Sequence, residues 1–351
     1  MKKLRIAQLS TPWERVPPPK YGGTELIASH LTEELTRRGH KVTLFATGDS
    51  ITKAKLRSVY PKALYRAGVP WTNSSWPLLH VQECMERSNE FDIIHNHFNY
   101  FGLAMGAYVK TPIVTTYHGD FETAEKDSGK RALLEKNKHM PFVSISNDQR
   151  THAKTHLRFV ATVYNAIDIH KFSFSNTPGA YLVWLGRITN KKGAVEAIQV
   201  AKRFGMKIYL AAKIDVIDRD FYAHNVKPLL SKRYAEYVGE IGHKEKVQLL
   251  KNAYALVNPI KWNEPFGLVM VEAQATGTPV VAFPRGAAPE LIREGKTGYF
   301  ARDVQGLADA LKKIPNLDRR ICRKNVEDHF TVEHMVHGYE AAYNKILHTR
   351  T

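Results

Sequence analysis

Cysteine is almost absent from this chain of 351 residues, which contains only Cys84 and Cys322. Two isolated cysteines supply neither the disulfide framework of a small secreted domain nor the ligands of a structural zinc site, so we expect reduced, buried thiols. No apolar run is long enough to cross a bilayer, and the segment 1–6 leads into a strand rather than a signal-peptide core. These absences predict a cytoplasmic protein.

Acidic residues are also scarce, since 34 Asp and Glu face 51 Lys and Arg and leave a formal charge of +17. Such an excess is typical of proteins that bind nucleic acid, an anionic membrane surface or an anionic substrate. No zinc-finger, homeodomain or RNA-recognition signature is present, and the basic residues are scattered over the expected helices. Specific nucleic-acid binding is therefore disfavoured, whereas an anionic substrate and peripheral contact with the inner membrane face both remain open.

Several common catalytic motifs are missing or incomplete. The first strand-to-helix loop has only Gly22-Gly23 in place of Gly-x-Gly-x-x-Gly, which disfavours a Rossmann oxidoreductase. Ser144 lacks the glycine-flanked elbow of a hydrolase nucleophile. The pair His95 and His97 would share one face of a strand but has no third metal ligand nearby.

The order of apolar runs predicts two α/β domains. One series of expected strands covers 4–10, 41–46, 92–97, 113–117, 142–146 and 162–164, and a second covers 181–185, 207–211, 235–238, 255–258 and 279–283. A helix capped by Thr24 and ended by Gly39 follows the first strand. Alternation of this kind predicts doubly wound parallel sheets. We expect domains over 1–168 and 169–330, a polar linker over 173–179, and a final helix within 331–351.

The segment from Glu264 to Glu272 is the most informative stretch of the chain. It follows an expected strand and contains Pro265-Phe266-Gly267-Leu268. A helix that begins near Phe266 would present unpaired N–H groups and the positive end of its dipole, which together favour an anion. Carboxylates at both ends suit hydroxyl groups. Acidic residues near a helix start also occur for structural reasons alone, but here the loop lies where ligands bind parallel sheets.

A second basic loop lies upstream. The buried strand at 181–185 gives way to Gly186-Arg187, and Lys192-Gly193 precedes an expected helix over 194–203. Arginine binds phosphate oxygens with a rigid fork, and lysine supplies a compact charge. The pair could therefore neutralise a diphosphate leaving group. The acidic Asp218-Arg219-Asp220 resembles a metal-binding Asp-x-Asp, but it precedes an expected helix, where acidic residues are common.

These motifs, together with Gly277-Thr278-Pro279-Val280-Val281, resemble the donor half of the retaining glycosyltransferases of family 4. The first half of the chain agrees, because Tyr21-Gly22-Gly23-Thr24-Glu25 lies in the first loop and Tyr117-His118-Gly119 ends a strand. The resemblance covers most of the chain. It implies the GT-B fold, in which two Rossmann-like domains face a cleft and the final helix crosses back to the first domain.

The resemblance also implies a role for each matched residue. Arg187 and Lys192 would stabilise the leaving diphosphate, Glu264 would lie beside the sugar, and Glu272 would hold the ribose hydroxyls. Backbone N–H groups of residues 266–268 would contact sugar or phosphate oxygens. In the first domain, Gly22 and Gly23 would let the backbone approach the diphosphate. His118 would form hydrogen bonds to the sugar and the acceptor.

The function implied is transfer of a hexose-type sugar from a nucleoside diphosphate to an acceptor hydroxyl, with retention at the anomeric carbon. The nucleotide sugar is a substrate, and no metal or resident cofactor is expected. UDP-sugars are favoured, and GDP-mannose stays open, as do carbohydrate, lipid-linked and small-molecule acceptors. The alternatives are a basic nucleic-acid- or membrane-binding α/β protein without sugar transfer, and a Rossmann oxidoreductase.

Overall fold

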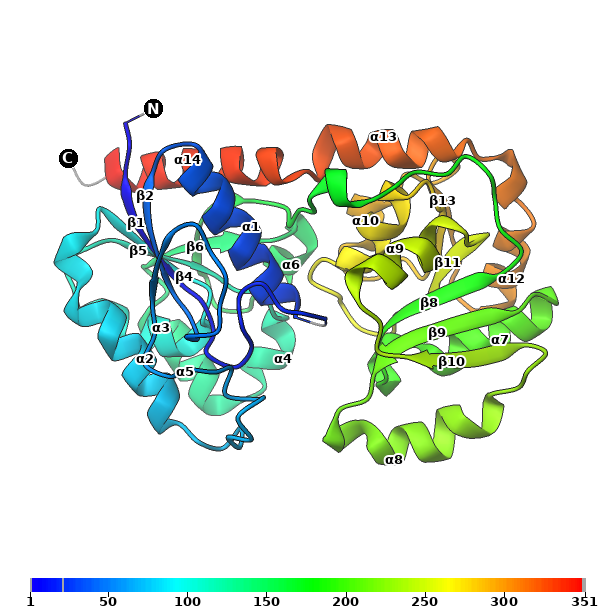
Figure 1. Ribbon diagram of the computed structural model, residues 1–351, viewed down its shortest axis with the longest axis horizontal. Coiled ribbons are helices and arrows are strands. Elements are labelled where there is room, and N and C mark those ends of the chain that lie inside the picture. The colour runs from blue at the N-terminus through cyan, green and yellow to red at the C-terminus, as the bar shows by residue number, and fades with distance from the viewer. Residues whose placement is uncertain (1, 21, 349–351) are drawn as a thin grey trace. The chain divides into compact units, whose positions relative to one another are not determined.

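The computed structural model describes residues 2–20 and 22–348, and the chain divides into two compact units (Figure 1). Unit 1 comprises residues 1–166 and 332–351, and unit 2 comprises residues 167–331. The polar stretch 173–179 lies inside unit 2. Each unit is built around its own parallel sheet.

Unit 1 contains a seven-stranded sheet in the order β3-β2-β1-β4-β5-β6-β7, and every pair is parallel. Its strands are β1 (Arg5–Leu9), β2 (Lys41–Phe45), β3 (Lys55–Arg57), β4 (Ile93–Asn96), β5 (Ile113–Thr116), β6 (Pro141–Ser144) and β7 (Arg158–Thr162). Its helices are α1 (Gly23–Arg37), α2 (Ser75–Glu86), α3 (Asn99–Met105), α4 (Phe121–Glu125), α5 (Ser128–Lys136), α6 (Asn147–Thr151) and α14 (Val332–His348). Although α14 is last in sequence, it packs against α1 and β7.

Unit 2 contains a six-stranded sheet in the order β10-β9-β8-β11-β12-β13, again parallel throughout. Its strands are β8 (Leu182–Arg187), β9 (Ile208–Lys213), β10 (Ala235–Gly239), β11 (Ala255–Asn258), β12 (Val280–Ala282) and β13 (Gly298–Phe300). Its helices are α7 (Ala194–Phe204), α8 (Arg219–Phe221), α9 (His243–Lys251), α10 (Leu268–Ala275), α11 (Ala288–Leu291), α12 (Val304–Leu311) and α13 (Arg319–His329).

The central strands are buried along their whole length because helices cover both faces of each sheet. Every residue of β4, β5 and β11 is buried. In unit 2, Trp184 and Leu210 point into a core that also includes Ile198 of α7 and Leu307 of α12. Burial of this apolar surface, at about 25 cal/mol per Å², is the main stabilising contribution to each unit.

Both sheets reverse their strand order once. The reversal lies between β1 and β4 in unit 1 and between β8 and β11 in unit 2. In doubly wound sheets, ligands bind outside the carboxyl ends of the strands at such a switch point. The loops that follow these four strands are therefore the first places to look for a site.

The structure corrects four details of the predicted elements. The strand expected at 162–164 instead spans Arg158–Thr162, and the short strands β3 and β13 were not predicted. Thr24 does not cap α1, which begins at Gly23 with Gly22 as its cap residue. Helix α10 begins at Leu268 rather than near Phe266. Strands β3 and β13 lie at sheet edges, have three residues each and show too little apolar pattern for prediction.

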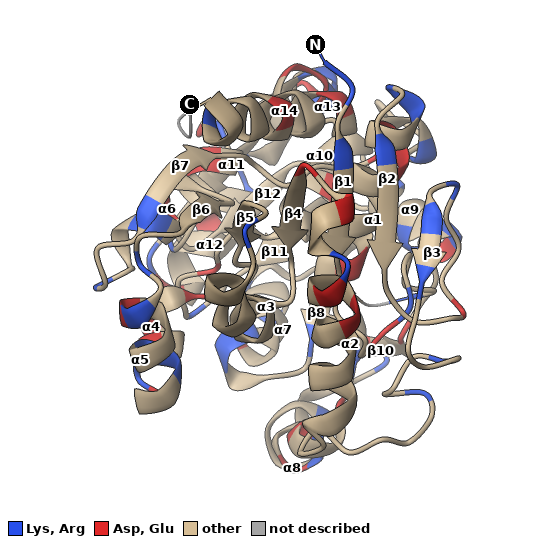
Figure 2. Cartoon of the chain, turned by 90° about the vertical axis from the view of Figure 1, so that its left-hand side faces the viewer, with Lys and Arg blue, Asp and Glu red and all other residues tan. Residues whose placement is uncertain are grey.

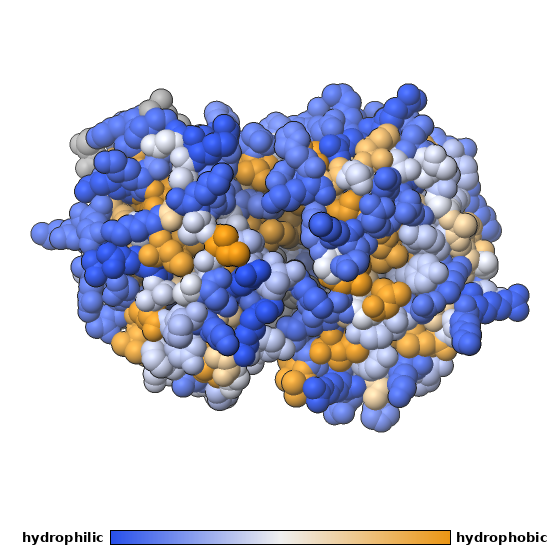
Figure 3. Space-filling view, in the orientation of Figure 1, coloured by the Kyte–Doolittle hydropathy of each residue, from blue (hydrophilic) through white to orange (hydrophobic). Residues whose placement is uncertain are grey.

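The charged residues are distributed rather than gathered in one stripe. Figure 2 shows Lys and Arg interspersed with Asp and Glu on the face that it presents. On the face shown in Figure 3, apolar patches are separated by hydrophilic atoms. No helix in the described part of the chain combines the length and the apolar character needed to cross a membrane.

Candidate functional site

Two loops at the switch point of unit 2 are in direct contact. One follows β8 and covers 188–193, and the other follows β11 and covers 259–267. The N–H of Lys261 donates to the carbonyl of Lys191 at 2.9 Å. Gly193 has a φ of 77°, and a Cβ there would lie 2.1 Å from the carbonyl oxygen of Pro259. Only glycine therefore permits this close approach.

An ion pair between Lys192 and Glu264 joins the two loops. The Lys192 ammonium also lies 5.1 Å from the centre of the Trp262 ring. The backbone of Glu264 is held in place, because its carbonyl accepts from the N–H of Ala287 at 2.9 Å. A Cβ on Gly286 would lie 2.3 Å from the Glu264 nitrogen, so this neighbouring loop packs tightly behind it. The backbone of Glu264 is therefore fixed, and the ion pair holds the side chains of Lys192 and Glu264 together.

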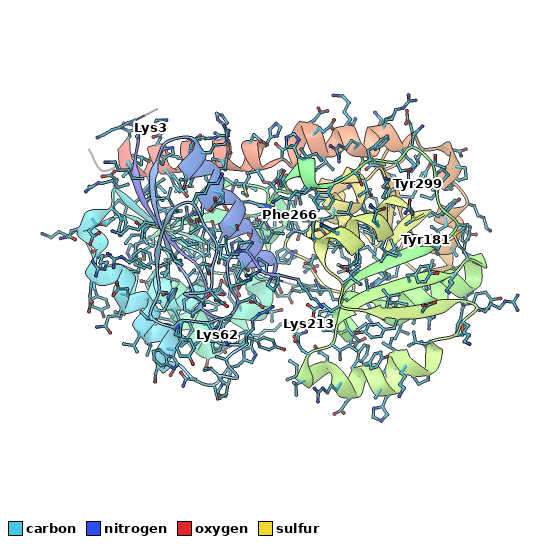
Figure 4. All side chains as sticks on the ribbon, viewed as in Figure 1. Lys3, Lys62, Tyr181, Lys213, Phe266 and Tyr299 are labelled. Carbon is cyan, nitrogen blue, oxygen red and sulfur yellow. The ribbon has the colours of Figure 1, made fainter. Side chains whose placement is uncertain are left out.

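Arg187 is the last residue of β8 and is held by two carboxylates from the loop after β9. Its Nε donates to Oδ2 of Asp218 at 2.6 Å and lies 3.0 Å from Oδ2 of Asp215. Lys213, which Figure 4 labels, lies at the carboxyl end of β9. Its Nζ is 2.8 Å from Oδ1 of Asp215. Two cations and two carboxylates therefore balance each other beside the strand end.

Helix α10 starts directly after the loop that follows β11. Gly267 has a φ of 93° and is the residue before the first helical turn, which begins at Leu268. The first N–H groups of a helix have no acceptor within it, and the dipole favours negative charge there. The side chain of Phe266 is only 2% exposed and packs against Phe330. The ring of Phe266 is therefore engaged in protein packing.

Glu272 lies in α10 and is more buried than a simple surface carboxylate. Only 3% of the residue is exposed, and its carboxylate forms an ion pair with Lys246 of α9. The pairing compensates the loss of hydration that burial imposes on the charge. The carboxylate of Glu272 is therefore held in position by Lys246.

In unit 1, the first loop runs from the end of β1 to Gly22 and Gly23. A Cβ on Gly22 would lie 2.7 Å from Cβ of Pro18, so glycine is required at this turn. Thr11 donates to Glu25 at 2.6 Å and ties the loop to α1. Tyr21 of the predicted motif lies outside the described residues.

His118 follows β5 by two residues and is partly exposed. Its Nε2 lies 2.9 Å from Nδ1 of His97, and the two rings are stacked. Loss of hydration lowers the pKa of His118 to about 4, so the ring is neutral at neutral pH. A neutral imidazole can form hydrogen bonds to hydroxyls but carries no charge to offset a phosphate.

No metal site is found among residues 2–20 and 22–348, where no group of three His, Cys, Asp or Glu side chains could hold an ion. Both nitrogens of His95 are engaged, with the hydroxyl of Tyr343 at 2.7 Å and Oγ1 of Thr116 at 2.8 Å. His95 of β4 is thus occupied by protein partners.

Two family models match successive parts of the chain. The model described as Glycosyltransferase Family 4 matches residues 21–171, and the one described as Glycosyl transferases group 1 matches residues 166–328. The chain belongs to the group 1 glycosyltransferases. This assignment replaces the two alternatives without sugar transfer, the basic binding protein and the oxidoreductase.

The glycosyltransferase resembles curated and solved relatives over most of its length. It is 26% identical to a glycogen synthase of Mycobacterium tuberculosis, over 89% of this chain and 86% of the relative. The structure of a sucrose-phosphate synthase from Thermosynechococcus elongatus matches with a TM-score of 0.81 and 18% identity, over 99% of this chain and all of the other. Anabaena HepE, solved with UDP and glucose, matches with a TM-score of 0.75 and 18% identity, over 97% and 100%. These structures establish the GT-B fold.

Sequence reasoning about the enzyme missed the residues that hold the predicted ones. Asp218 was interpreted as an acidic residue at a helix start, yet its side chain binds Arg187. The register of the strands could have located this partner. Arg187 pairs with Lys213 across β8 and β9, so the loop that begins after Lys213, which includes Asp218, lies beside Arg187. The pairing of Lys246 with Glu272 links two helices and had no such local signal.

Proposed function

We propose that this glycosyltransferase transfers a hexose-type sugar from a nucleoside-diphosphate sugar to an acceptor hydroxyl, with retention at the anomeric carbon and without a metal ion. The observation that carries the proposal is the arrangement at the switch point of unit 2. There Arg187 ends β8, the Lys192–Glu264 pair joins the loops that follow β8 and β11, and the second loop leads into α10.

The leaving group is the part of the reaction that these residues serve. When the bond between the anomeric carbon and the phosphate oxygen breaks, negative charge develops on the diphosphate. Arg187, Lys192 and the first N–H groups of α10 stabilise that charge from fixed positions. The acceptor oxygen forms the new bond to the anomeric carbon, and its proton passes to the departing phosphate oxygen. No separate enzymatic base is then needed.

The remaining residues bind and orient the substrate. Glu264 contacts hydroxyls of the sugar, and Glu272 holds the ribose hydroxyls. In unit 1, Gly22 and Gly23 let the backbone approach the diphosphate, and His118 bonds to a sugar or acceptor hydroxyl. These interactions persist in ground and transition states, so they chiefly determine substrate binding.

Relatives support a uridine nucleotide as the favoured donor. HepE was solved with UDP and glucose and also with UDP-glucose. The sugars share the hydroxyls that two glutamates recognise, so GDP-mannose remains a second donor to test. Retention rests on the resemblance to family 4. Carbohydrate, lipid-linked and small-molecule acceptors are all consistent with the proposal, and the basic chain would favour contact with an anionic membrane or an anionic acceptor.

The test is a panel of UDP-, GDP- and ADP-sugars, scored by nucleotide release with and without EDTA. We expect release from one UDP-hexose, unchanged by the chelator, because two basic side chains supply the positive charge. NMR of the product should show the anomeric configuration of the donor. Loss of turnover in EDTA that manganese restores would refute metal independence, and an inverted product would refute retention. Binding of none of these nucleotide sugars would refute the donor assignment.

A further inference from the structure

A continuous row of hydrogen bonds runs from His118 into the interior of unit 1. We call it the histidine relay, and its members are His118, His97, Gln8, Tyr343 and His95. The successive distances are 2.9, 2.9, 3.3 and 2.7 Å. Apart from His118, every member is 0% exposed. In a buried polar group of this kind, each hydrogen must meet an acceptor. The choice of donor and acceptor in one hydrogen bond of the relay therefore fixes the choice in the next.

The side-chain amide of Gln8 determines that direction. Its Oε1 faces Nε2 of His97, and an oxygen can only accept. His97 therefore has its proton on Nε2 and an unprotonated Nδ1. This Nδ1 can only accept from Nε2 of His118, so His118 also has its proton on Nε2. The remaining nitrogen of His118, Nδ1, is left with a lone pair.

Tyr343 occupies the other side of the same amide. Nε2 of Gln8 donates to the Tyr343 hydroxyl, whose own hydrogen then has Nδ1 of His95 as its acceptor. If the amide were reversed, every ring in the relay would have to exchange its protonated nitrogen. The hydroxyl of Tyr343, on α14, therefore influences which nitrogen of His118 carries the proton. The two residues are far apart in sequence.

We propose that Gln8, His97 and Tyr343 are positioning residues that keep Nδ1 of His118 unprotonated, so that it accepts a hydrogen bond from a substrate hydroxyl. Within residues 2–20 and 22–348, Nδ1 of His118 has no hydrogen-bond partner, and the residue is partly exposed. The inference rests on the proposed function, because it takes the ligand of His118 to be a hydroxyl of the sugar or of the acceptor. It predicts that this position recognises hydroxyl donors and disfavours groups that only accept.

The decisive test is the tautomer of His118 in the full-length protein, measured by long-range proton–nitrogen NMR with ¹⁵N-labelled histidine. The signal that disappears in His118→Asn identifies the ring. We expect a protonated Nε2 and an unprotonated Nδ1 in the wild type. A proton on Nδ1 would overturn the proposal, whatever the enzyme transfers. Failure of all nucleotide sugars as donors would instead refute the proposed function and leave the spectrum unaffected.

Two tyrosines on α14 provide a matched pair of variants. Tyr343→Phe removes the acceptor of the Gln8 N–H, so reversed amides should become populated and His118 should show both tautomers. Tyr339 is one turn away and equally buried, but its hydroxyl lies 3.1 Å from Oγ1 of Thr116, beyond the far end of the relay. Tyr339→Phe should keep a single tautomer. Identical spectra for the two variants would overturn the role of Tyr343.

Turnover gives a second readout. We expect Tyr343→Phe to lower kcat/KM about fivefold, the effect of losing one ordinary hydrogen bond in part of the population, with Tyr339→Phe near wild type.

At position 118, asparagine places an oxygen near the Nδ1 position and glutamine near the Nε2 position. His118→Asn should therefore retain more activity than His118→Gln, and the reverse order would contradict the proposal. If the His118 variants lose donor hydrolysis without acceptor as much as they lose transfer, the hydroxyl that His118 binds belongs to the donor sugar. If they lose only transfer, it belongs to the acceptor.

Discussion

The ammonium group of Lys192 and the carboxylate of Glu264 form an ion pair between the two loops that meet at the switch point of the six-stranded sheet. The pair fixes both side chains before any substrate arrives. Stabilisation by charges already in place requires no reorganisation at the moment of reaction. An incoming diphosphate would compete with Glu264 for Lys192, and would leave Glu264 free to contact sugar hydroxyls.

Removing either predicted cation should impair catalysis rather than folding. We expect Lys192→Ala and Arg187→Ala each to lower kcat by about 10²–10³, the usual effect of deleting one preorganised group that stabilises transition-state charge. The measurement is nucleotide release at saturating donor, with thermal unfolding recorded in parallel. The control is Lys207→Ala, which removes a lysine paired with Glu236 at 2.6 Å just before β9. Wild-type kcat in the Arg187 variant would contradict its role at the leaving group.

The contact between Arg187 and Asp218 leads to a prediction about product affinity. Asp218→Asn keeps a hydrogen-bond acceptor for Nε but removes a negative charge beside the proposed diphosphate site. We expect UDP to bind about fivefold more tightly, as a unit charge several ångströms away permits, and kcat to fall because Arg187 is less firmly held. Calorimetric titration with UDP tests the affinity. Weaker UDP binding would show that Asp218 serves the ligand in another way.

Much of the fold could be predicted because its strands are nearly continuous apolar runs. Ala255–Asn258 was predicted with its observed bounds, and the end of β5 differed by a single residue. Alternation of strands and helices was enough to predict parallel, doubly wound sheets. The strand β3 was missed because Lys55 and Arg57 leave only one apolar residue in it. Such short edge strands depend on a neighbouring strand rather than on their own pattern.

The partners of the site residues were harder to predict than the residues themselves. Glycines beside Arg187 and Lys192 marked the loop after β8 as a place of close approach, and the structure shows that Gly193 indeed contacts the next loop. The relay behind His118 brings together residues as distant as Gln8 and Tyr343. Sequence spacing carries no signal for such contacts, because they depend on how α14 packs in unit 1.

The burial of Glu272 changes what its removal should do. A surface carboxylate could be lost without effect on folding, but Glu272 is 3% exposed and paired with Lys246. We expect Glu272→Ala to raise the KM for the donor with little change in kcat, because ribose contacts act in ground and transition states alike. We also expect it to lower the free energy of unfolding by about 1–3 kcal/mol, since Lys246 loses its partner. Kinetics and urea denaturation measure the two effects.

A double variant separates these two effects of Glu272. Adding Lys246→Met to Glu272→Ala removes the unpaired ammonium, so part of the lost stability should return while the donor KM stays high. A normal KM in the Glu272→Ala variant would show that the carboxylate has a purely structural role.

Buried histidines should make the protein less stable in mild acid. His80 is 1% exposed, its Nε2 donates to the carbonyl of Ser10 at 2.9 Å, and burial lowers its pKa to about 4. Between pH 6.5 and 4 the unfolded chain therefore binds a proton that the folded chain does not, and stability falls as the pH falls through this range. We expect His80→Gln, which retains an N–H for Ser10, to reduce the loss of unfolding free energy between pH 7.5 and 5.0 by about 2 kcal/mol. Urea denaturation at both pH values measures the difference, and His170→Gln serves as the exposed control. Equal losses of unfolding free energy in His80→Gln and the wild type would show that the His80 imidazole is protonated in the folded state.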